Sequence, residues 1–211
     1  MLGRDQAFTA WPDARSTRIL GEVEPAVFLD RDNTLIENDS DLGDPDAVRL
    51  CEGVPDGLAA LRRAGFRLVV VTNQGGVARG KFCESDVEAV HQRIASLVDG
   101  AANGTGLIDR FYYCPFHPAA ELEAYRREHP WRKPNPGMLL QAARDLRLDL
   151  TRSWMIGDQP RDIDAGRSAG CRTALITGDG AGASELQPSV VARCFSEAVQ
   201  QILKTTPTPH G

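Results

Sequence analysis

The sequence predicts an α/β fold, a Rossmann-like doubly wound parallel sheet with helices on both faces. Short continuous apolar runs, such as the one from Ala26 to Leu29, are typical of strands buried on both faces. These runs alternate along the chain with segments whose apolar residues recur at helical spacing. Because 211 residues suffice for one such domain with a full core, we expect a domain over residues 25–204. An N-terminal extension over 1–24 and a C-terminal tail over 205–211 would flank it.

The first predicted strand ends at Asp30. Residues 36–50, rich in Asp, Asn, Gly and Pro, follow as a loop that would face a substrate. A helix is expected over 54–64, closed by Gly65. A second buried strand, over 66–72, then runs into the polar cluster that begins at Thr72.

A tight turn is expected at Gly75 and Gly76. The next helix should begin at Ser85, because Glu88 follows three residues later as in a capping box. It should end near Gly100, with His91 facing solvent.

The second half repeats the alternation. A third strand is expected over 108–114, followed by a long insertion over 115–136 that would serve function. The remaining strands are expected over 153–157, 173–177 and 190–195, and the remaining helices over 137–147, 163–169 and 196–204.

Composition narrows the function. Hydrophobic and charged residues make up 42% and 25% of the chain, as is typical of soluble globular proteins. The net charge of −5 argues against nucleic acid as the main partner. No apolar run approaches the ~20 residues of a membrane span, and the N-terminus is too polar for a signal peptide. The five scattered cysteines do not suggest a disulfide framework, so we expect a cytoplasmic protein.

Acidic residues stand where predicted strands end. Asp30 and Asp32 follow the first strand, and Asp158 follows the strand over 153–157. Open α/β sheets place their chemistry beyond the carboxyl ends of the strands. Adjacent carboxylates there would be explained by a divalent cation and a phosphate. The alternative is that one aspartate caps a turn and the other is solvated.

Four motifs in order resemble the haloacid dehalogenase-like phosphatases. They are DRDNT at 30–34, Thr72 after an apolar strand, Lys133, and GDQPRD at 157–162. The stretches VVVTNQGGVARGKF, YYCPFHP and RKPNPGML resemble the branch that dephosphorylates heptose bisphosphates and histidinol phosphate. The resemblance covers roughly residues 26–178 and implies a relatively open site with no large cap domain.

The resemblance implies a role for each motif residue. Asp30 would be the nucleophile, and Asp32 the general acid and base. Mg²⁺ would be held by Asp30, the backbone carbonyl of Asp32, and Asp158. Thr72 and Lys133 would bind the transferred phosphoryl group, whereas Asn73 and Arg132 would contact the rest of the substrate. Asp162 would orient Lys133 or a metal-bound water, or cap the following helix.

Two positions depart from this branch. Asn33 stands where glycine is usual, and asparagine tolerates a positive φ better than most residues. Gln159 stands where heptose-specific members often have lysine, which weakens the case for a bisphosphate. The substrate expected is a small phosphorylated metabolite, either a heptose 1,7-bisphosphate or histidinol phosphate. A catalytically silent phosphate-binding protein and a phosphotransferase remain the rival functions.

The insertion lacks the full set of ligands for the structural zinc that related phosphatases often carry. Cys114, His117 and His129 are present, but Phe116 and Trp131 occupy two of the four ligand positions. Structural zinc is almost always held by four ligands. We therefore expect no zinc, with Phe116 packed against Trp131, Cys114 buried and His129 at the surface.

Overall fold

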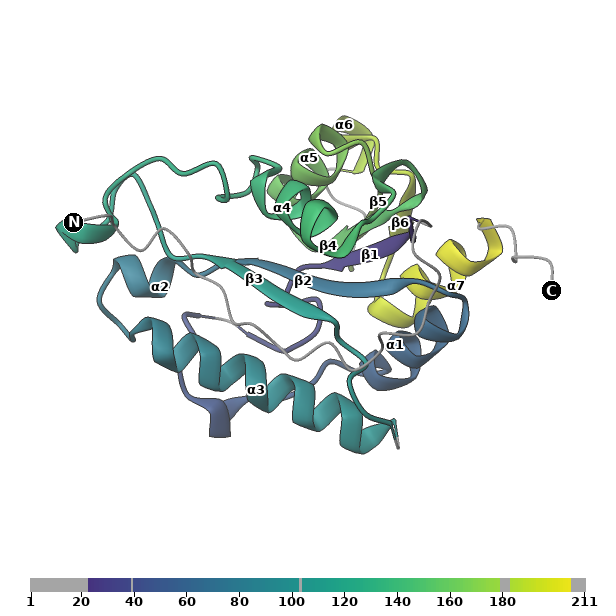
Figure 1. The fold of residues 1–211 in the computed structure, drawn as a ribbon, viewed down its shortest axis with the longest axis horizontal. Coiled ribbons are helices and arrows are strands. Elements are labelled where there is room, and N and C mark those ends of the chain that lie inside the picture. The colour runs from purple at the N-terminus through teal and green to yellow at the C-terminus, as the bar shows by residue number, and fades with distance from the viewer. Residues whose placement is uncertain (1–22, 39, 103, 179–182, 206–211) are drawn as a thin grey trace.

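In the computed structural model, six parallel strands of the described residues form one sheet in the order β3-β2-β1-β4-β5-β6 (Figure 1). The predicted doubly wound parallel sheet is confirmed. The structure describes residues 23–38, 40–102, 104–178 and 183–205, so nearly all of the expected extension over 1–24 and tail over 205–211 lies outside the described residues. The strands are β1 Ala26–Leu29, β2 Arg67–Asn73, β3 Arg110–Cys114, β4 Trp154–Gly157, β5 Arg172–Ile176 and β6 Val190–Ala192.

Helices cover both faces of the sheet, with α1, α3 and α7 on one face and α4, α5 and α6 on the other (Figure 1). Among the described residues no separate cap domain is present. The helices are α1 Val54–Arg63, α2 Gly75–Ala78, α3 Glu84–Ala101, α4 Gly137–Leu146, α5 Pro160–Ser168, α6 Ala183–Leu186 and α7 Phe195–Thr205, with 3₁₀ turns η1 Pro45–Ala47, η2 Glu123–Tyr125 and η3 Leu150–Arg152.

The side chains of β1 show why its apolar run does not alternate with polar residues. Val27 and Leu29 lie in the core shared with α1, α3 and α7. Ala26 and Phe28 lie in the core shared with α4 and α5. Successive side chains of a strand point to opposite faces, and both faces of this sheet are covered. Full burial of each large apolar side chain contributes about 1.5–3 kcal/mol.

The strand order reverses between β1 and β4. The chain places β2 and β3 on one side of β1, then returns to place β4, β5 and β6 on the other. Crevices for ligands form at the carboxyl ends of strands at such a point. Asp30 and Asp158 directly follow the two strands that flank this reversal, and the backbone N–H of Asp30 still donates to Ile156 O at 2.9 Å.

Two helix starts differ from the prediction. The capping box of α3 is formed by Cys83 and Asp86, not by Ser85 and Glu88. Asp86 Oδ2 accepts from the Cys83 backbone N–H at 2.8 Å, and the Cys83 thiol takes the place usually held by a hydroxyl. Helix α5 begins at Pro160 rather than Ile163, because proline suits the first turn of a helix.

The glycine pair after β2 forms the short helix α2 instead of a turn alone. Glycine is a poor helix former, so propensity gave no sign of this. A Cβ atom at Gly76 would overlap the ring of Phe82. Packing against Phe82 therefore requires a residue without a side chain here.

The expectation that His91 faces solvent was wrong. Its side chain on α3 is 1% exposed and stacks on Phe111 with ring centroids 4.6 Å apart. It also meets Tyr113 edge-on at 5.7 Å. Burial holds the pKa of His91 well below its usual range, with the charge of Arg31 acting the same way.

Candidate active site

Lys133 lies at the centre of the site, although it comes from the insertion between β3 and α4. Its ammonium group lies 2.6 Å from Asp30 Oδ1 and 2.7 Å from Asp162 Oδ1, and it donates to Val71 O at 2.8 Å. The residue is 2% exposed. Burial acts against the charged form, but the two carboxylates raise the pKa of Lys133 above its usual value. The structure thus brings three sequence-predicted residues into one buried charge network.

The nucleophile candidate is strongly desolvated. The pKa of Asp30 is raised to about 7, mainly by burial, and the charge of Lys133 opposes this shift. The negative charges of Asp162 and Asp32 contribute to the rise. A carboxylate in this position is poorly hydrated and needs positive charge nearby to remain ionised.

The backbone of Lys133 is held separately from its ammonium group. Asn73 Nδ2 donates to Lys133 O, and the Lys133 backbone N–H donates to Asn73 Oδ1, each at 3.0 Å. The peptide bond from Lys133 to Pro134 is cis. Both polar atoms of the Asn73 amide are therefore used to fix Lys133. Asn73 was expected to contact substrate, and it does line the pocket described below.

Three carboxylates gather near Lys133. Ligand oxygens of Asp30, Asp158 and Asp162 all lie within 4.8 Å of one another. Both oxygens of Asp162 are engaged, Oδ1 by Lys133 and Oδ2 by the Gln159 backbone N–H at 3.0 Å. Asp162 thus caps α5 and orients Lys133 together, as the sequence allowed.

Asp158 has a carboxylate oxygen that is available to bind a metal ion. Its Oδ1 is buried and has no hydrogen-bond partner among the described residues, while its Oδ2 accepts from Gln159 Nε2 at 2.8 Å. Burial raises the pKa of Asp158. A hard cation with oxygen ligands would satisfy this atom and share Asp30. The residues therefore fit Mg²⁺.

Asp32 stands at the edge of the cluster, with its side chain 25% exposed. Gln74 Nε2 donates both to Asp32 Oδ2 at 3.1 Å and to Thr72 Oγ1 at 2.8 Å, so it links two predicted site residues. Asn33 adopts the predicted positive φ, 55°, which turns the chain directly after Asp32. The aspartates of the DRDNT motif thus face the site from one short turn.

A pocket of about 280 Å³ opens beside Asp32. Its walls combine amide and hydroxyl side chains with three arginines, Arg79, Arg132 and Arg161. Arg132 Nη1 donates to Phe116 O at 3.2 Å, and Arg79 pairs with Asp41. Such a wall suits an anionic, hydroxyl-rich molecule. The full lining is Asp32, Asn33, Asn38, Ser40, Asp41, Asn73, Gly75, Arg79, Arg132 and Arg161.

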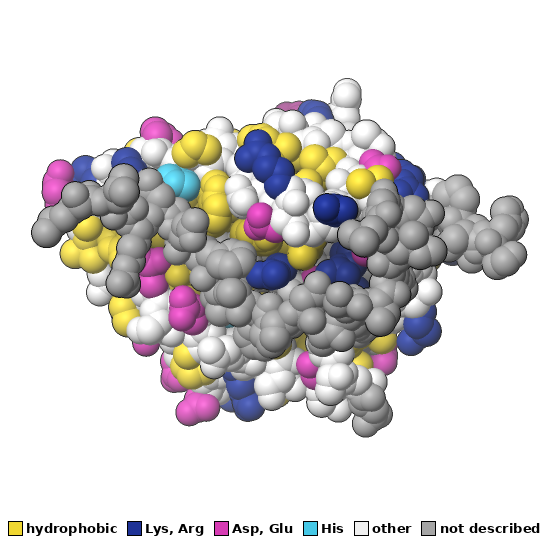
Figure 2. All heavy atoms as spheres, in the orientation of Figure 1, with side chains coloured by type: hydrophobic (Ala, Val, Ile, Leu, Met, Phe, Trp, Pro, Cys, Tyr) yellow, Lys and Arg dark blue, Asp and Glu magenta, His cyan; other side chains and the backbone are white. Residues whose placement is uncertain are grey.

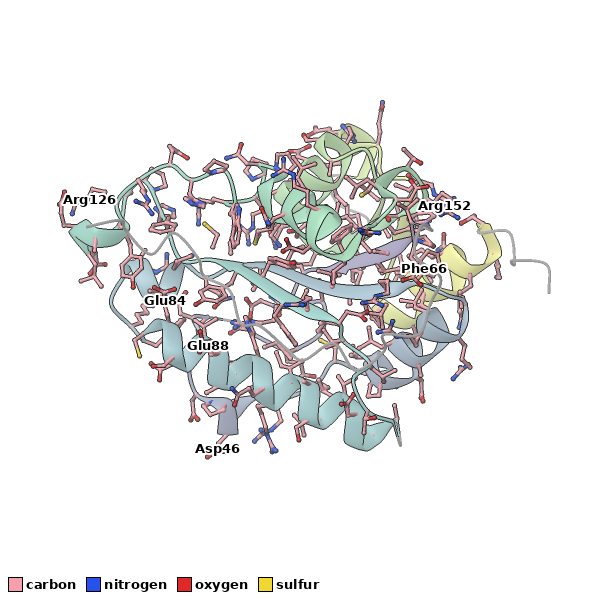
Figure 3. The ribbon with its side chains drawn as sticks, in the orientation of Figure 1. Asp46, Phe66, Glu84, Glu88, Arg126 and Arg152 are labelled. Atoms are coloured by element: carbon pink, nitrogen blue, oxygen red, sulfur yellow. The ribbon has the colours of Figure 1, made fainter. Side chains whose placement is uncertain are left out.

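The insertion is tied to the body of the protein by Glu84 at the start of α3 (Figure 3). Its carboxylate accepts from the hydroxyls of Tyr113 and Tyr125, each at 2.9 Å. Tyr113 lies on β3 and Tyr125 in η2 of the insertion. One carboxylate therefore joins a helix, a strand and the insertion.

The aromatic contacts of the insertion differ from the prediction. His129 lies between the two rings that were expected to pack directly, stacking on Phe116 at 4.7 Å and meeting Trp131 edge-on at 6.1 Å. It is half-buried rather than a surface residue. The sequence could not show this, because stacking between neighbouring rings leaves no spacing pattern.

The candidate zinc ligands of the insertion are not gathered. Cys114 is buried, as expected, and its thiol faces Phe116 O at 3.8 Å. Within the described ranges, Cys114, His117 and His129 form no group of closely spaced ligand atoms. The expectation that the protein carries no structural zinc stays a prediction.

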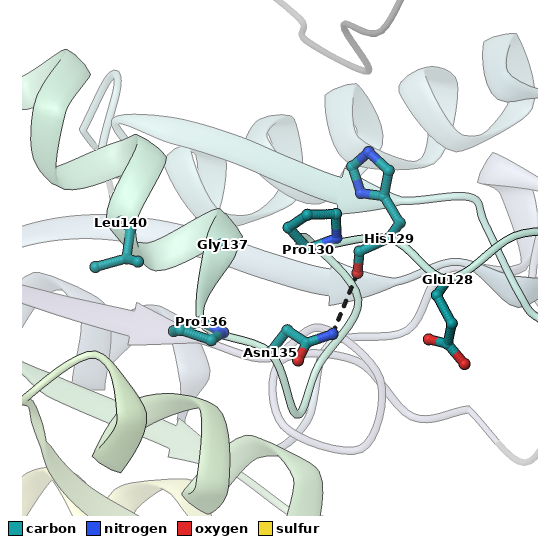
Figure 4. A pocket seen from close by; sticks show the side chains of 7 residues that line it. All are labelled: Glu128, His129, Pro130, Asn135, Pro136, Gly137 and Leu140. Atoms are coloured by element: carbon teal, nitrogen blue, oxygen red, sulfur yellow. Dashed lines mark hydrogen bonds between the residues drawn. The ribbon is translucent and has the colours of Figure 1, made fainter.

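A second pocket, of about 400 Å³, lies where the insertion enters α4 (Figure 4). Asn135 Nδ2 donates to His129 O at 3.3 Å across its floor. None of its lining residues belongs to the predicted site. They are Glu128, His129, Pro130, Asn135, Pro136, Gly137 and Leu140.

Sequence reasoning missed several residues that border the site. Asn38 lies in the loop expected to face a substrate, and Gln74 in the polar cluster after β2, so both carried a positional signal. The arginines carried no such signal, because only the fold shows that they border the site. The missed residues are Arg31, Asn38, Gln74, Arg79 and Arg161.

The chain is similar in sequence to known proteins. A family model described as HAD-hydrolase-like matches residues 130–198. The D-glycero-β-D-manno-heptose-1,7-bisphosphate 7-phosphatase of Escherichia coli K12 is 40% identical over 157 residues, 74% of this chain and 80% of its own. The enzyme of the same name from Vibrio cholerae is 36% identical and covers 85% of this chain and 95% of its own.

A solved structure gives the same result in three dimensions. The D,D-heptose 1,7-bisphosphate phosphatase of B. bronchiseptica, complexed with magnesium and phosphate, superposes with a TM-score of 0.72 at 27% identity. The match covers 86% of this chain and 99% of that one. The chain therefore belongs to the haloacid dehalogenase-like phosphatases, in the branch of the heptose-bisphosphate phosphatases.

Proposed function

We propose that the protein removes the 7-phosphate of a D-glycero-D-manno-heptose 1,7-bisphosphate through an aspartyl-phosphate on Asp30. The observation that carries this proposal is the buried contact between Asp30 and Lys133 beside Asp158, at the strand-order reversal. The arginine-lined pocket next to it supplies the second argument. The 40% identity to heptose-bisphosphate phosphatases supports the same substrate.

Asp30 attacks phosphorus in line, and the bond to the sugar oxygen breaks. Lys133 and Thr72 bind the phosphoryl oxygens as charge develops on them. Asp30, the backbone carbonyl of Asp32 and Asp158 would hold Mg²⁺. When bound, the ion neutralises phosphate charge that would otherwise repel the Asp30 carboxylate. The ion pair with Asp162 orients the Lys133 ammonium group for this contact.

Asp32 acts as the general acid and then as the general base. It protonates the leaving sugar oxygen and later accepts a proton from the water that hydrolyses the aspartyl-phosphate. The side chain is partly exposed, so water can reach it. An open site favours water as the acceptor over another alcohol, and the presence of a general acid argues against a silent binding protein.

A second phosphate explains the arginines of the pocket. Arg132 and Arg161 have guanidinium groups suited to paired bonds with phosphate oxygens. Gln159, whose identity argued against a bisphosphate, donates to Asp158 instead. Arg161, two residues after Gln159, thus supplies a positive charge close to the position where heptose-specific members often have lysine. Histidinol phosphate, the alternative substrate, has no second phosphate to use these groups.

Phosphate release from a substrate panel tests this function. The panel contains heptose 1,7-bisphosphates of both anomers, histidinol phosphate, nucleotides and p-nitrophenyl phosphate, each with Mg²⁺ and with EDTA. We expect the highest kcat/KM on a heptose bisphosphate and no turnover in EDTA. A higher value on histidinol phosphate would replace the proposed substrate, and no release from any ester would reject the phosphatase chemistry.

Arg132→Ala should impair the bisphosphate far more than p-nitrophenyl phosphate. Loss of a charged hydrogen-bond partner costs about 1.5–3 kcal/mol, or roughly 10–100-fold in kcat/KM on the bisphosphate. The aryl ester has no distal phosphate and should change little. Arg126→Ala removes another arginine of the same insertion outside the pocket, and should affect neither substrate. Equal losses on both substrates in Arg132→Ala would place its action on the transferred phosphate or on structure.

We also propose a cytoplasmic location and a small metabolite as the partner, rather than nucleic acid or a membrane. No helix in the described part of the chain has the length and apolarity to cross a bilayer. Among the side chains that Figure 2 shows in colour, acidic and basic ones are interspersed. This pattern does not favour polyanion binding.

A further inference from the structure

Arg31 is buried beside the reaction centre, between the two aspartates of the motif. Its exposed fraction is 0%. Nε and Nη2 both donate to Asp32 Oδ1, at 3.1 and 3.0 Å. A buried guanidinium needs acceptor oxygens for its N–H groups, because a charge in the interior without polar partners is very costly. Asp32 therefore has one side in solvent and the other on a cation that solvent does not reach.

The two oxygens of Asp32 have different surroundings. Asn38 Nδ2 also donates to Oδ1, at 2.7 Å, so three donor nitrogens converge on this oxygen. Among the described residues, Oδ2 accepts only from Gln74 Nε2, at 3.1 Å. Each carboxylate oxygen has about two lone pairs. Oδ1 is thus saturated, whereas Oδ2 keeps a lone pair for a proton.

The backbone of Arg31 is fixed as firmly as its side chain. Its carbonyl accepts from the N–H groups of Leu35 at 2.9 Å and Ile36 at 3.1 Å. Leu35 and Ile36 are both fully buried. The turn that carries Asp32 is therefore anchored in the core, and the Arg31 guanidinium holds the Asp32 carboxylate from its buried side.

We propose that Arg31 is a positioning residue that makes Oδ2 the proton-transferring oxygen of Asp32. As the bond between phosphorus and the leaving oxygen breaks, the proton on Oδ2 passes to that oxygen and the new bond to Asp30 forms. Water then attacks phosphorus, its proton returns to Oδ2, and phosphate leaves Asp30. This inference rests on the proposed phosphatase chemistry.

Leaving-group dependence tests the inference in Arg31→Met, which keeps the length of the side chain but removes its charge and donors. The measurement is kcat/KM for monoesters ranging from p-nitrophenyl phosphate to simple alkyl phosphates, because kcat/KM reports steps through alcohol release. Nitrophenolate leaves without a proton, whereas an alkoxide needs one. We expect kcat/KM to fall about 10²-fold on alkyl esters, the scale of lost acid–base catalysis, and to change within about threefold on the nitrophenyl ester.

Two further variants keep the test decisive. Arg31→Lys keeps the charge but cannot place two nitrogens on one oxygen, and should steepen the leaving-group dependence less than Arg31→Met does. If Arg31→Met fails to fold, Arg31→Lys alone provides the same comparison with the wild type. Arg62→Met removes another arginine–aspartate contact, a partly buried one with Asp109 outside the site, and should leave the leaving-group dependence unchanged.

An unchanged leaving-group dependence in the folded Arg31 variants, or equal losses on all esters, would overturn the inference. If the wild-type protein hydrolyses none of the esters, the proposed function fails instead. The two failures are therefore distinguishable in one set of measurements.

Discussion

Asp30→Asn should abolish phosphate release while the protein stays folded. The amide cannot attack phosphorus, and removal of a nucleophile typically costs roughly 10⁴-fold or more in turnover. The fold should survive because Lys133 keeps its ion pair with Asp162, at 2.7 Å. The substitution also removes one of three clustered carboxylates. The measurements are phosphate release with Mg²⁺ and thermal unfolding in EDTA.

A matched control for this variant is Asp109→Asn. Like Asp30, Asp109 is a largely buried aspartate with a cationic partner, here Arg62. It lies away from the site, where it accepts from the Leu68 backbone N–H at the start of β2. It should lose stability and keep turnover. Asp30→Asn protein with wild-type activity would rule out an aspartyl-phosphate on this residue.

Lys133→Met should lose both turnover and a large part of the folding stability. Removing one partner of a buried ion pair costs about 3–5 kcal/mol, because the remaining charge is left in the interior. Here two carboxylates, Asp30 and Asp162, would lose their cation. Equilibrium urea unfolding in EDTA measures the loss.

The second substitution Asp162→Asn should restore part of that stability, because it removes one of the two stranded charges. It should not restore turnover, since the phosphoryl group still lacks Lys133. If Asp162→Asn added to Lys133→Met lowered the free energy of unfolding further, the stabilising role of this ion pair would be refuted.

The fold was predictable because its determinants are local. Buried strands appear as apolar runs, and the residue after each run marks the edge where parallel strands end. The order of these runs along the chain was therefore enough to place Asp30, Thr72 and Asp158 at one edge of the sheet. The buried contact of Lys133 with Asp30 could not be predicted in this way, because it joins residues separated by 103 positions.

Residues that were misjudged have neighbours that are distant in sequence. His91 resembles a surface residue on its helix, and only Phe111 on β3 explains its burial. Gly76 gives a poor helix signal, and only the ring of Phe82 explains why glycine is needed there. Arg31 was not singled out from the sequence, and its burial also depends on tertiary packing.

The two hydrogen bonds between the Asn73 side chain and the Lys133 backbone hold Lys133 in place independently of the earlier part of the insertion. They fix Lys133 from β2, whose position in the central sheet does not depend on residues 115–130. Substitutions in residues 115–130 should therefore change the contacts of the insertion while the Lys133 backbone keeps its two hydrogen bonds to Asn73.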